Sequence, residues 1–187
     1  MLVLLDRDGV INRDAAEGIL RAEDFHFLPG AVEAIAQLRH AGFRVAVCTN
    51  QSAVGRGRLS EAELTRIHQR MCDGVAEAGG CIDAVFYAPD PPQAPTHRRK
   101  PGPGMLLEAM AKFAAQPAQT PMVGDMLRDL EAAQAAGCPR VLVRTGKGRH
   151  TEAQGLPAAL APVTVVDDLL EAVRHILAHY ASTRHGS

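Results

Sequence analysis

The sequence predicts an α/β fold in which a central parallel sheet is covered by helices on both faces. Three observations support this prediction. The 187 residues fit a single domain that is large enough to bury its own core. Short apolar runs alternate along the chain with segments of helical periodicity. These runs are apolar on both faces, as is typical of strands between two layers of helices. We therefore expect one Rossmann-like, three-layer domain over residues 1–181, followed by a flexible tail at 182–187.

The elements of the first half follow in order. Residues 2–5 form an apolar strand that ends at acidic residues. A helix begins at Pro29 and ends at Gly42, and residues 43–48 form the second strand. The sequence Ser60-Glu61-Ala62-Glu63 is a capping box. It precedes a helix that buries Leu64, Ile67, Met71 and Val75.

The second half continues the alternation. Residues 82–87 form the third strand, and the six prolines of residues 89–103 predict a stiff loop. A helix with Leu106, Met110 and Phe113 on one face follows this loop. Further strands are predicted at 121–123, 141–143 and 163–166, with a helix before Gly137. The last helix buries Leu169, Val173, Ile176 and Tyr180.

Composition excludes several classes of partner. The formal net charge is −1, so no overall cationic field favours nucleic acid or anionic lipid. No apolar run approaches the roughly 20 residues of a membrane helix, and the early charged residues do not fit a signal peptide. The four cysteines lie far apart, which predicts free thiols in a reducing compartment. We expect a cytoplasmic monomer that binds neither nucleic acid nor membrane.

Polar sequences follow three of the predicted strands. The carboxyl ends of parallel strands meet at the same edge of a sheet, where ligands bind. We therefore expect the three sequences to converge into one site. They are Asp6-Arg7-Asp8-Gly9, Thr49-Asn50-Gln51-Ser52 and Gly124-Asp125.

Carboxylates dominate these strand ends. Asp6 and Asp8 form one pair, and Asp125 and Asp129 form another. Each has a simpler structural explanation, because Asp8-Gly9 is a turn dipeptide and an acidic first turn complements a helix dipole. Brought together, however, the carboxylates repel one another unless a cation lies between them. Oxygen ligands of this kind suit Mg²⁺, so we predict a magnesium site.

Arg99 and Lys100 supply the opposite charge from the proline-rich loop. A basic pair in a loop is commonly solvated, but beside a metal site it offers a fork and a point charge for phosphate. Thr49 adds a hydroxyl donor at the end of the second strand. Backbone N–H groups of Asn50, Gln51 and Ser52 follow it.

In this order and spacing, these motifs resemble the four motifs of the haloacid dehalogenase (HAD) superfamily. The resemblance covers about residues 2–150. It rests on Leu5-Asp6-Arg7-Asp8-Gly9-Val10-Ile11-Asn12, Thr49-Asn50-Gln51, Arg99-Lys100-Pro101 and Gly124-Asp125-x-x-x-Asp129. The first three also resemble the branch that contains heptose 1,7-bisphosphate 7-phosphatases and histidinol phosphatases. The later sequence Val143-Arg144-Thr145-Gly146-Lys147-Gly148 is similar to the heptose enzymes.

The resemblance implies Mg²⁺-dependent hydrolysis of a phosphomonoester through an aspartyl-phosphate. Asp6 would be the nucleophile. Asp8 would be the general acid and base, and we expect burial and the Asp6 charge to keep it protonated in the first step. The metal ligands would be Asp6, the Asp8 backbone carbonyl and Asp125, with Asp129 behind them. The phosphoryl group would be held by Thr49 and Lys100.

The implied substrate is a small phosphorylated sugar, foremost the 7-phosphate of D-glycero-D-manno-heptose 1,7-bisphosphate. Asn50, Gln51 and Ser52 are candidate substrate-binding residues. Arg56 and Arg99 are candidates for a second phosphate, although Arg56 equally fits a solvated loop. The alternatives are histidinol phosphate, another small phosphomonoester and a nucleic-acid 3′-phosphate, which the near-neutral charge disfavours. A non-catalytic phosphate-binding module is an alternative of another class.

The chain departs from the family's pattern in three places. Residues 88–98 lack the cysteines that hold zinc in many relatives, so we expect no zinc. Met126 stands where a lysine commonly follows the metal-binding aspartate, and Arg128 is a candidate for the missing charge. No segment has room for an inserted cap domain. The site should therefore be open, with residues 12–25 and 52–58 at its rim.

Overall fold

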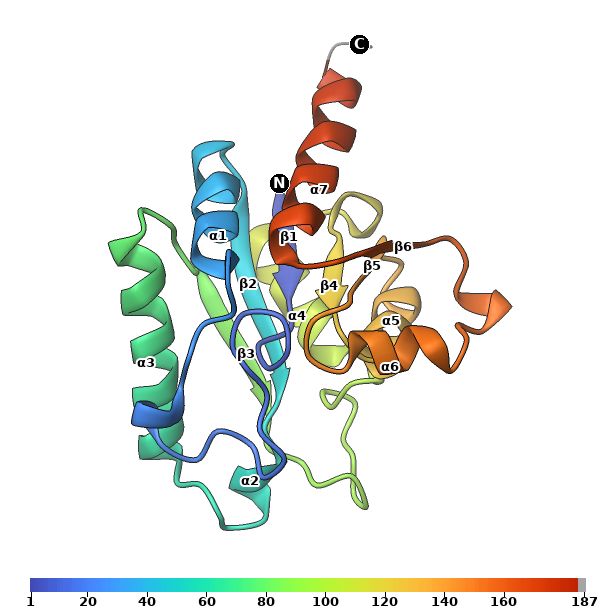
Figure 1. Ribbon diagram of the computed structural model, residues 1–187. Helices are drawn as coiled ribbons and strands as arrows, with labels where there is room; N and C mark the ends of the chain where they lie inside the picture. Colours follow the sequence, from blue (N-terminus) through green and yellow to red (C-terminus); the bar gives the residue numbers. More distant parts are fainter. Residues whose placement is uncertain (185–187) are drawn as a thin grey trace.

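A six-stranded parallel sheet forms the centre of the molecule (Figure 1). The computed structural model describes the backbone of residues 1–184 and the side chains of residues 1–180. The strand order is β3-β2-β1-β4-β5-β6, so the predicted parallel sheet is confirmed. The strands are β1 (Leu2–Leu5), β2 (Arg44–Asn50), β3 (Ala84–Ala88), β4 (Met122–Gly124), β5 (Arg140–Val143) and β6 (Val163–Val166).

Helices cover both faces of the sheet. One core lies between the sheet and α1 (Ala31–His40), α3 (Glu61–Glu77) and α7 (Leu169–Arg184). The other lies between the sheet and α4 (Gly104–Phe113) and α5 (Leu127–Ala135). Side chains along a strand alternate between the two faces, so Val3 and Leu5 join the first core while Leu2 and Leu4 join the second. This two-sided burial explains why the strands contain so few polar residues.

Several short elements escaped the sequence analysis. They are the helices α2 (Ser52–Gly55) and α6 (Gly148–Ala153) and the 3-10 turns η1 (Ala22–Asp24), η2 (Pro117–Gln119) and η3 (Ala158–Leu160). Elements of this length contain too few residues to show a hydrophobic period. Loops together with α2 and α6 surround the carboxyl edge of the sheet (Figure 1).

Two local expectations need correction. At the predicted capping box, Ser60 Oγ accepts the Glu63 N–H at 3.1 Å, but Glu63 does not return the bond. Its Oε1 instead accepts the Ala22 N–H at 3.0 Å, which joins η1 to α3. At the C-terminus, α7 extends to residue 184 and so includes half of the segment expected to be a tail. Residues 185–187 lie outside the described residues.

The strand order places the site. β1 lies between β2 and β4, so the strand order extends from β1 toward both edges of the sheet. At such a switch point the loops after neighbouring strands diverge and leave a crevice. Asp6, Gln51 and Asp125 follow the three central strands directly. Among the helices within residues 1–184, none is both long and apolar enough to span a bilayer.

Candidate active site

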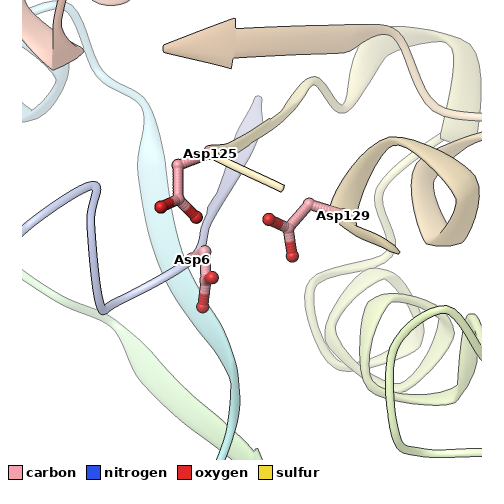
Figure 2. A group of neighbouring side chains, drawn as sticks. All are labelled: Asp6, Asp125 and Asp129. Atoms are coloured by element: carbon pink, nitrogen blue, oxygen red, sulfur yellow. The ribbon is translucent and has the colours of Figure 1, made fainter. Parts of the chain in front are cut away.

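Three aspartates from two strand ends form the floor of the site (Figure 2). Asp6 follows β1, Asp125 follows β4, and Asp129 lies in the first turn of α5. The Asp6 N–H donates to Val123 O at 2.9 Å, which holds the two strand ends in register. Carboxylate oxygens of the three residues lie within 4.8 Å of one another, and all three side chains are buried. The predicted convergence of Asp6 and Asp125 is thus what the structure shows.

Glycines allow the backbone to close around Asp125. A Cβ on Gly9 or on Gly146 would collide with Asp125 Oδ2, and both glycines have positive φ. The same oxygen accepts the Lys147 N–H at 2.8 Å, and the Asp125 carbonyl accepts the Thr151 hydroxyl at 2.9 Å. The loop after β5 therefore fixes the orientation of this carboxylate.

Lys100 is the buried cation of the floor. Its Nζ lies 2.9 Å from Asp6 Oδ1 and 2.7 Å from Asp129 Oδ1, and its side chain is fully buried. Burial alone would lower the pKa of Lys100, but the charges of Asp129 and Asp6 raise it, so the ammonium stays charged. Asn50 holds its backbone through two hydrogen bonds, of 2.9 Å to the carbonyl and 3.0 Å from the N–H. The Asn50 amide thus positions Lys100, although we expected Asn50 to bind substrate.

The floor carries more negative charge than Lys100 can balance. Burial raises the pKa of Asp125 to about 8, with further contributions from the charges of Asp129 and Asp6. Burial also raises the pKa of Asp6 to about 6, and Asp129 and Asp8 add to the effect while Lys100 opposes it. Buried carboxylates that resist ionisation together fit a hard divalent cation with oxygen ligands. These residues therefore suit Mg²⁺.

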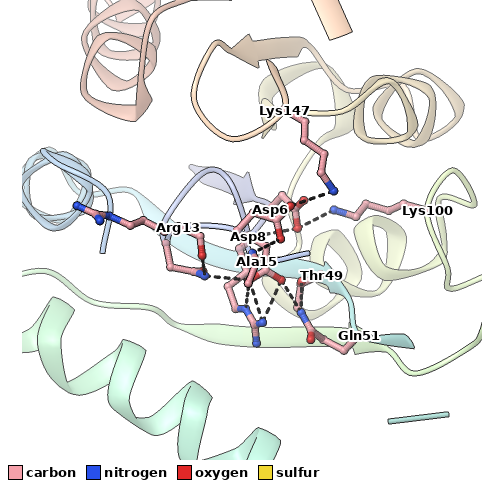
Figure 3. Close-up of polar contacts among 11 residues, drawn as sticks. Asp6, Asp8, Arg13, Ala15, Thr49, Gln51, Lys100 and Lys147 are labelled. Carbon is pink, nitrogen blue, oxygen red and sulfur yellow. Dashed lines mark hydrogen bonds and ion pairs between the residues drawn. The ribbon is translucent and has the colours of Figure 1, made fainter. Parts of the chain in front are cut away.

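Asp8 has an environment of the opposite kind. Its carboxylate accepts hydrogen bonds from Arg7 at 2.9–3.2 Å, from Asn12 at 2.9 Å and from Gln51 at 2.8 Å (Figure 3). Burial alone would raise the pKa of Asp8, but the Arg7 charge and these hydrogen bonds lower it. The expectation that Asp8 has a raised pKa is therefore wrong for the free protein. The reason is that the fully buried Arg7 side chain turns back on its neighbour.

Thr49 and Gln51 lie beside Asp8. Gln51 Nε2 donates to Asp8 Oδ2 and, at 3.0 Å, to Thr49 Oγ1. The Gln51 backbone N–H donates to Ala88 O at 2.8 Å. The backbone and side-chain N–H groups of Gln51 all donate to other parts of the protein. We had expected Gln51 to bind substrate.

An open pocket lies above the floor and includes both predicted rim segments. Asp8 and Asp125 contribute to its base. Ion pairs cross its rim, with Lys147 Nζ 3.0 Å from Asp14 Oδ2 and with Arg58 paired to Glu17. The remaining lining residues include Ala15, Ala16, Gly18, Asn50, Gln51, Ser52, Ala53, Arg56, Met126 and Arg128.

Of the two basic candidates for the phosphate, Arg128 lies in the pocket and Arg99 does not. Arg99 is 9% exposed and donates to the Asp90 carbonyl at 2.8 Å, so it braces the proline-rich loop. Burial and the charges of Arg128 and Arg56 lower the pKa of Arg99. Arg128 lines the pocket, and its Nε is buried without a hydrogen-bond partner in the described part of the chain.

Lys147 is the pocket residue that sequence reasoning missed. Its signal was present in the sequence 143–148, whose similarity to heptose enzymes we noted without assigning a role to any of its residues.

Comparisons with known proteins agree with this geometry. The HAD-hydrolase-like family model matches residues 97–172. A D-glycero-beta-D-manno-heptose-1,7-bisphosphate 7-phosphatase from Bordetella bronchiseptica is 41% identical over 94% of this chain and 97% of its own length. The enzyme of that name from Pseudomonas aeruginosa is 42% identical over 94% and 97%, and that from Escherichia coli K12 is 36% identical over 92% and 93%.

Solved structures give the same result. The crystal structure of D,D-heptose 1,7-bisphosphate phosphatase from B. bronchiseptica, complexed with magnesium and phosphate, has a TM-score of 0.90 at 41% identity. The match covers 95% of this chain and 98% of the chain in that crystal structure. The corresponding Burkholderia thailandensis structure has a TM-score of 0.73 at 42% identity, with 94% and 97% covered.

Proposed function

We propose that this protein releases the 7-phosphate of a heptose 1,7-bisphosphate. The reason is that the chain belongs to the family of D-glycero-beta-D-manno-heptose-1,7-bisphosphate 7-phosphatases among the HAD-like hydrolases. The observation that carries the proposal is the buried floor, where Lys100 joins Asp6 to Asp129 and Asp125 lies alongside. A nucleophile, a fixed cation and a set of metal ligands are the parts that phosphoryl transfer requires.

Asp6 is the nucleophile in this proposal. Its Oδ1 accepts the Arg7 N–H at 2.7 Å and pairs with Lys100. Oδ2 has no hydrogen-bond or ion-pair partner among residues 1–180, so we assign the attack on phosphorus to it. The new bond joins this oxygen to phosphorus while the bond from phosphorus to the sugar oxygen breaks. Water then attacks phosphorus, which releases inorganic phosphate and restores the carboxylate.

Asp8 is the general acid and base. It donates one to the departing sugar oxygen and takes one from the attacking water. Because the pKa of Asp8 is lowered in the free protein, the carboxylate must gain its proton when substrate binds. A phosphate dianion nearby raises the pKa of a carboxyl group, so binding itself favours the acid form.

The charge of the phosphoryl group is balanced by fixed groups. Asp6, the Asp8 carbonyl and Asp125 would hold Mg²⁺, which would offset negative charge on the phosphate. Lys100 adds a permanent positive charge in a buried setting, where it acts more strongly than in water. Thr49 contributes a hydroxyl donor. Asp129 keeps Lys100 in place through its 2.7 Å ion pair.

The second phosphate of the substrate fits the basic side of the pocket. Arg56, Arg128 and Lys147 line it, and Ser52 lies at its edge. Arg128 supplies the positive charge that a lysine at position 126 commonly provides in relatives. Its buried Nε has no hydrogen-bond partner among the described residues, which supports this assignment. Arg99 does not line the pocket and instead donates to the Asp90 carbonyl of the proline-rich loop.

Some broader properties belong to the same proposal. We propose that residues 1–181 act as one catalytic domain and that the protein is a cytoplasmic monomer. The four cysteines are free, which fits a reducing compartment. The large hydrophobic side chains exposed in the described chain are Met1 and Leu107, too few for a broad apolar interface. The expected absence of zinc stays a prediction, which metal analysis of the purified protein checks.

The experiment that tests the function is a substrate comparison with a nucleophile variant. Purified protein in Mg²⁺ should hydrolyse heptose 1,7-bisphosphate faster than histidinol phosphate or a 3′-phosphorylated oligonucleotide, with both anomers of the heptose tested. Asp6→Asn should lose turnover of every substrate by more than about 10⁴-fold, since uncatalysed phosphomonoester hydrolysis is extremely slow. Asp24→Asn, an exposed aspartate of η1, is the matched control. Preference for histidinol phosphate would reassign the substrate, and turnover by Asp6→Asn would reject the nucleophile.

A further inference from the structure

Gln51 lies at a junction between two groups that act on the phosphate. It precedes α2 at the carboxyl end of β2 and is 5% exposed. Its side chain turns inward, between Asp8 and Thr49 (Figure 3). The hydrogen bond from its backbone N–H to Ala88 O at 2.8 Å anchors it to the end of β3.

The orientation of the Gln51 amide is determined by its neighbours. An ionised carboxylate only accepts hydrogen bonds, so the NH₂ group must face Asp8 Oδ2, which lies 2.8 Å away. The same nitrogen lies 3.0 Å from Thr49 Oγ1. Both amide hydrogens are thereby used, one on each partner. Gln51 has no N–H left for a substrate phosphate.

This arrangement determines what the Thr49 hydroxyl can do. A threonine hydroxyl has one hydrogen and two acceptor positions. One acceptor position takes the Gln51 hydrogen, and no other side-chain hydrogen bond of Thr49 occurs among residues 1–180. The hydroxyl hydrogen therefore points away from Gln51. Thr49 is the penultimate residue of β2, which pairs with β1, so its hydroxyl lies at the edge of the sheet that carries Asp6 and Asp8.

We propose that Gln51 is a positioning residue for phosphoryl transfer, which makes the Thr49 hydroxyl a donor to the phosphate and, together with Arg7, fixes the position of Asp8 Oδ2. The inference rests on the proposed phosphatase activity and adds to it a residue that touches neither substrate nor metal. A single nitrogen with two hydrogens serves both partners. An oxygen in its place carries at most one hydrogen and cannot.

Two substitutions at position 51 separate positioning from packing. Gln51→Glu places an acceptor beside Thr49, so the hydroxyl hydrogen turns toward position 51 and away from the phosphate. Gln51→Met keeps the volume, removes both donors and adds no acceptor. We expect kcat to fall about 100-fold in Gln51→Glu and about 10-fold in Gln51→Met, in the range for one lost donor to the transition state. KM should change by less than about 3-fold, because the Thr49 donor acts mainly on the charge that develops in the transition state.

The control is a glutamine with the same kind of partner on the surface. Gln69 Nε2 donates to Asp73 Oδ1 at 2.7 Å on the exposed side of α3. Gln69→Glu should leave kcat and KM unchanged. Melting temperatures of all variants show whether a loss of rate reflects a loss of fold.

Thr49→Val tests whether Gln51 acts through Thr49. In the wild-type background we expect it to lower kcat about 30-fold. In the Gln51→Glu background it should cost less than about 3-fold more, because the hydroxyl is already turned away. Should Gln51→Glu not fold, the same cycle with Gln51→Met gives the coupling. Inorganic phosphate, titrated calorimetrically, supplies a readout without turnover, and its Kd should likewise differ by less than about 3-fold between these variants and the wild type.

Two results would overturn the inference. One is a Gln51→Glu rate that equals or exceeds that of Gln51→Met. The other is an equal cost of Thr49→Val in both backgrounds. Failure of the proposed function is distinct, because it shows in the wild-type protein and in Asp6→Asn before any change at position 51.

Discussion

The floor and the rim of the pocket use the same chemical pair in different surroundings. On the floor, Lys100 lies between Asp6 and Asp129, with 0% of the lysine side chain exposed. At the rim, Lys147 pairs with Asp14 at 3.0 Å, with 52% and 22% of their side chains exposed. Charges in the buried pair interact strongly, whereas water and salt screen the exposed one. The floor is therefore suited to fixed charge stabilisation and the rim to exchanging a protein partner for a substrate anion.

The largest effect is expected from removal of the floor cation. Lys100→Met should lower kcat by about 10³-fold or more, because the developing charge loses a fixed cation in a buried site. It should also destabilise the protein by about 3–5 kcal/mol, since Asp129 is left buried without its partner. Steady-state kinetics and urea unfolding measure the two effects.

Lys112→Met provides the matched control, because Lys112 lies exposed near the end of α4. It should change neither rate nor stability by a measurable amount. A Lys100→Met protein that kept a tenth of the wild-type rate would show that the floor does not depend on this charge.

Magnesium should stabilise the protein more strongly as pH rises. In the metal-free protein the pKa values of Asp125 and Asp6 are about 8 and about 6, both above the ordinary 3.8. Protons on these groups stabilise the metal-free fold at low pH, and this stability is lost as pH rises through 6 and 8. A cation must displace the protons, so apparent Mg²⁺ affinity should rise on the order of 100-fold from pH 6 to pH 8.

Thermal unfolding at fixed Mg²⁺ across this range measures the dependence. Asp125→Asn removes the group with the higher pKa and should flatten the curve. An Mg²⁺-induced increase in melting temperature that is the same at pH 6 and pH 8 would contradict the charge balance of the floor.

The floor was also more predictable from sequence than the rim. Asp6 and Asp125 directly follow buried strands, so the parallel topology alone brings them together. The same reasoning gave the six strands and the five longer helices. Lys100 was found as part of a motif, but its pairing with Asp129 depends on how the proline-rich loop is fastened by Asn50.

Contacts that depend on side-chain rotamers could not be predicted from the sequence. Nothing in the order of residues shows that Arg7 turns back on Asp8 and lowers its pKa. The Gln51 amide likewise could face solvent or the site, and only the packed structure places it between Asp8 and Thr49. The rim pair of Lys147 with Asp14 joins loops separated by most of the chain, with no period or register to relate them.

The smallest effect is expected at that rim pair. Lys147→Met should destabilise the protein by less than about 1 kcal/mol, because exposed ion pairs contribute little. The backbone N–H that holds Asp125 is unchanged, so kcat should stay within about 3-fold. If Lys147 exchanges Asp14 for the second phosphate, KM for the bisphosphate should rise about 10-fold, while KM for a monophosphate stays constant. Asp14→Asn, which frees the lysine, should not raise KM for the bisphosphate. An equal increase for both substrates would show instead that Lys147 attracts anions in general, and the rim would then differ from the floor in strength alone.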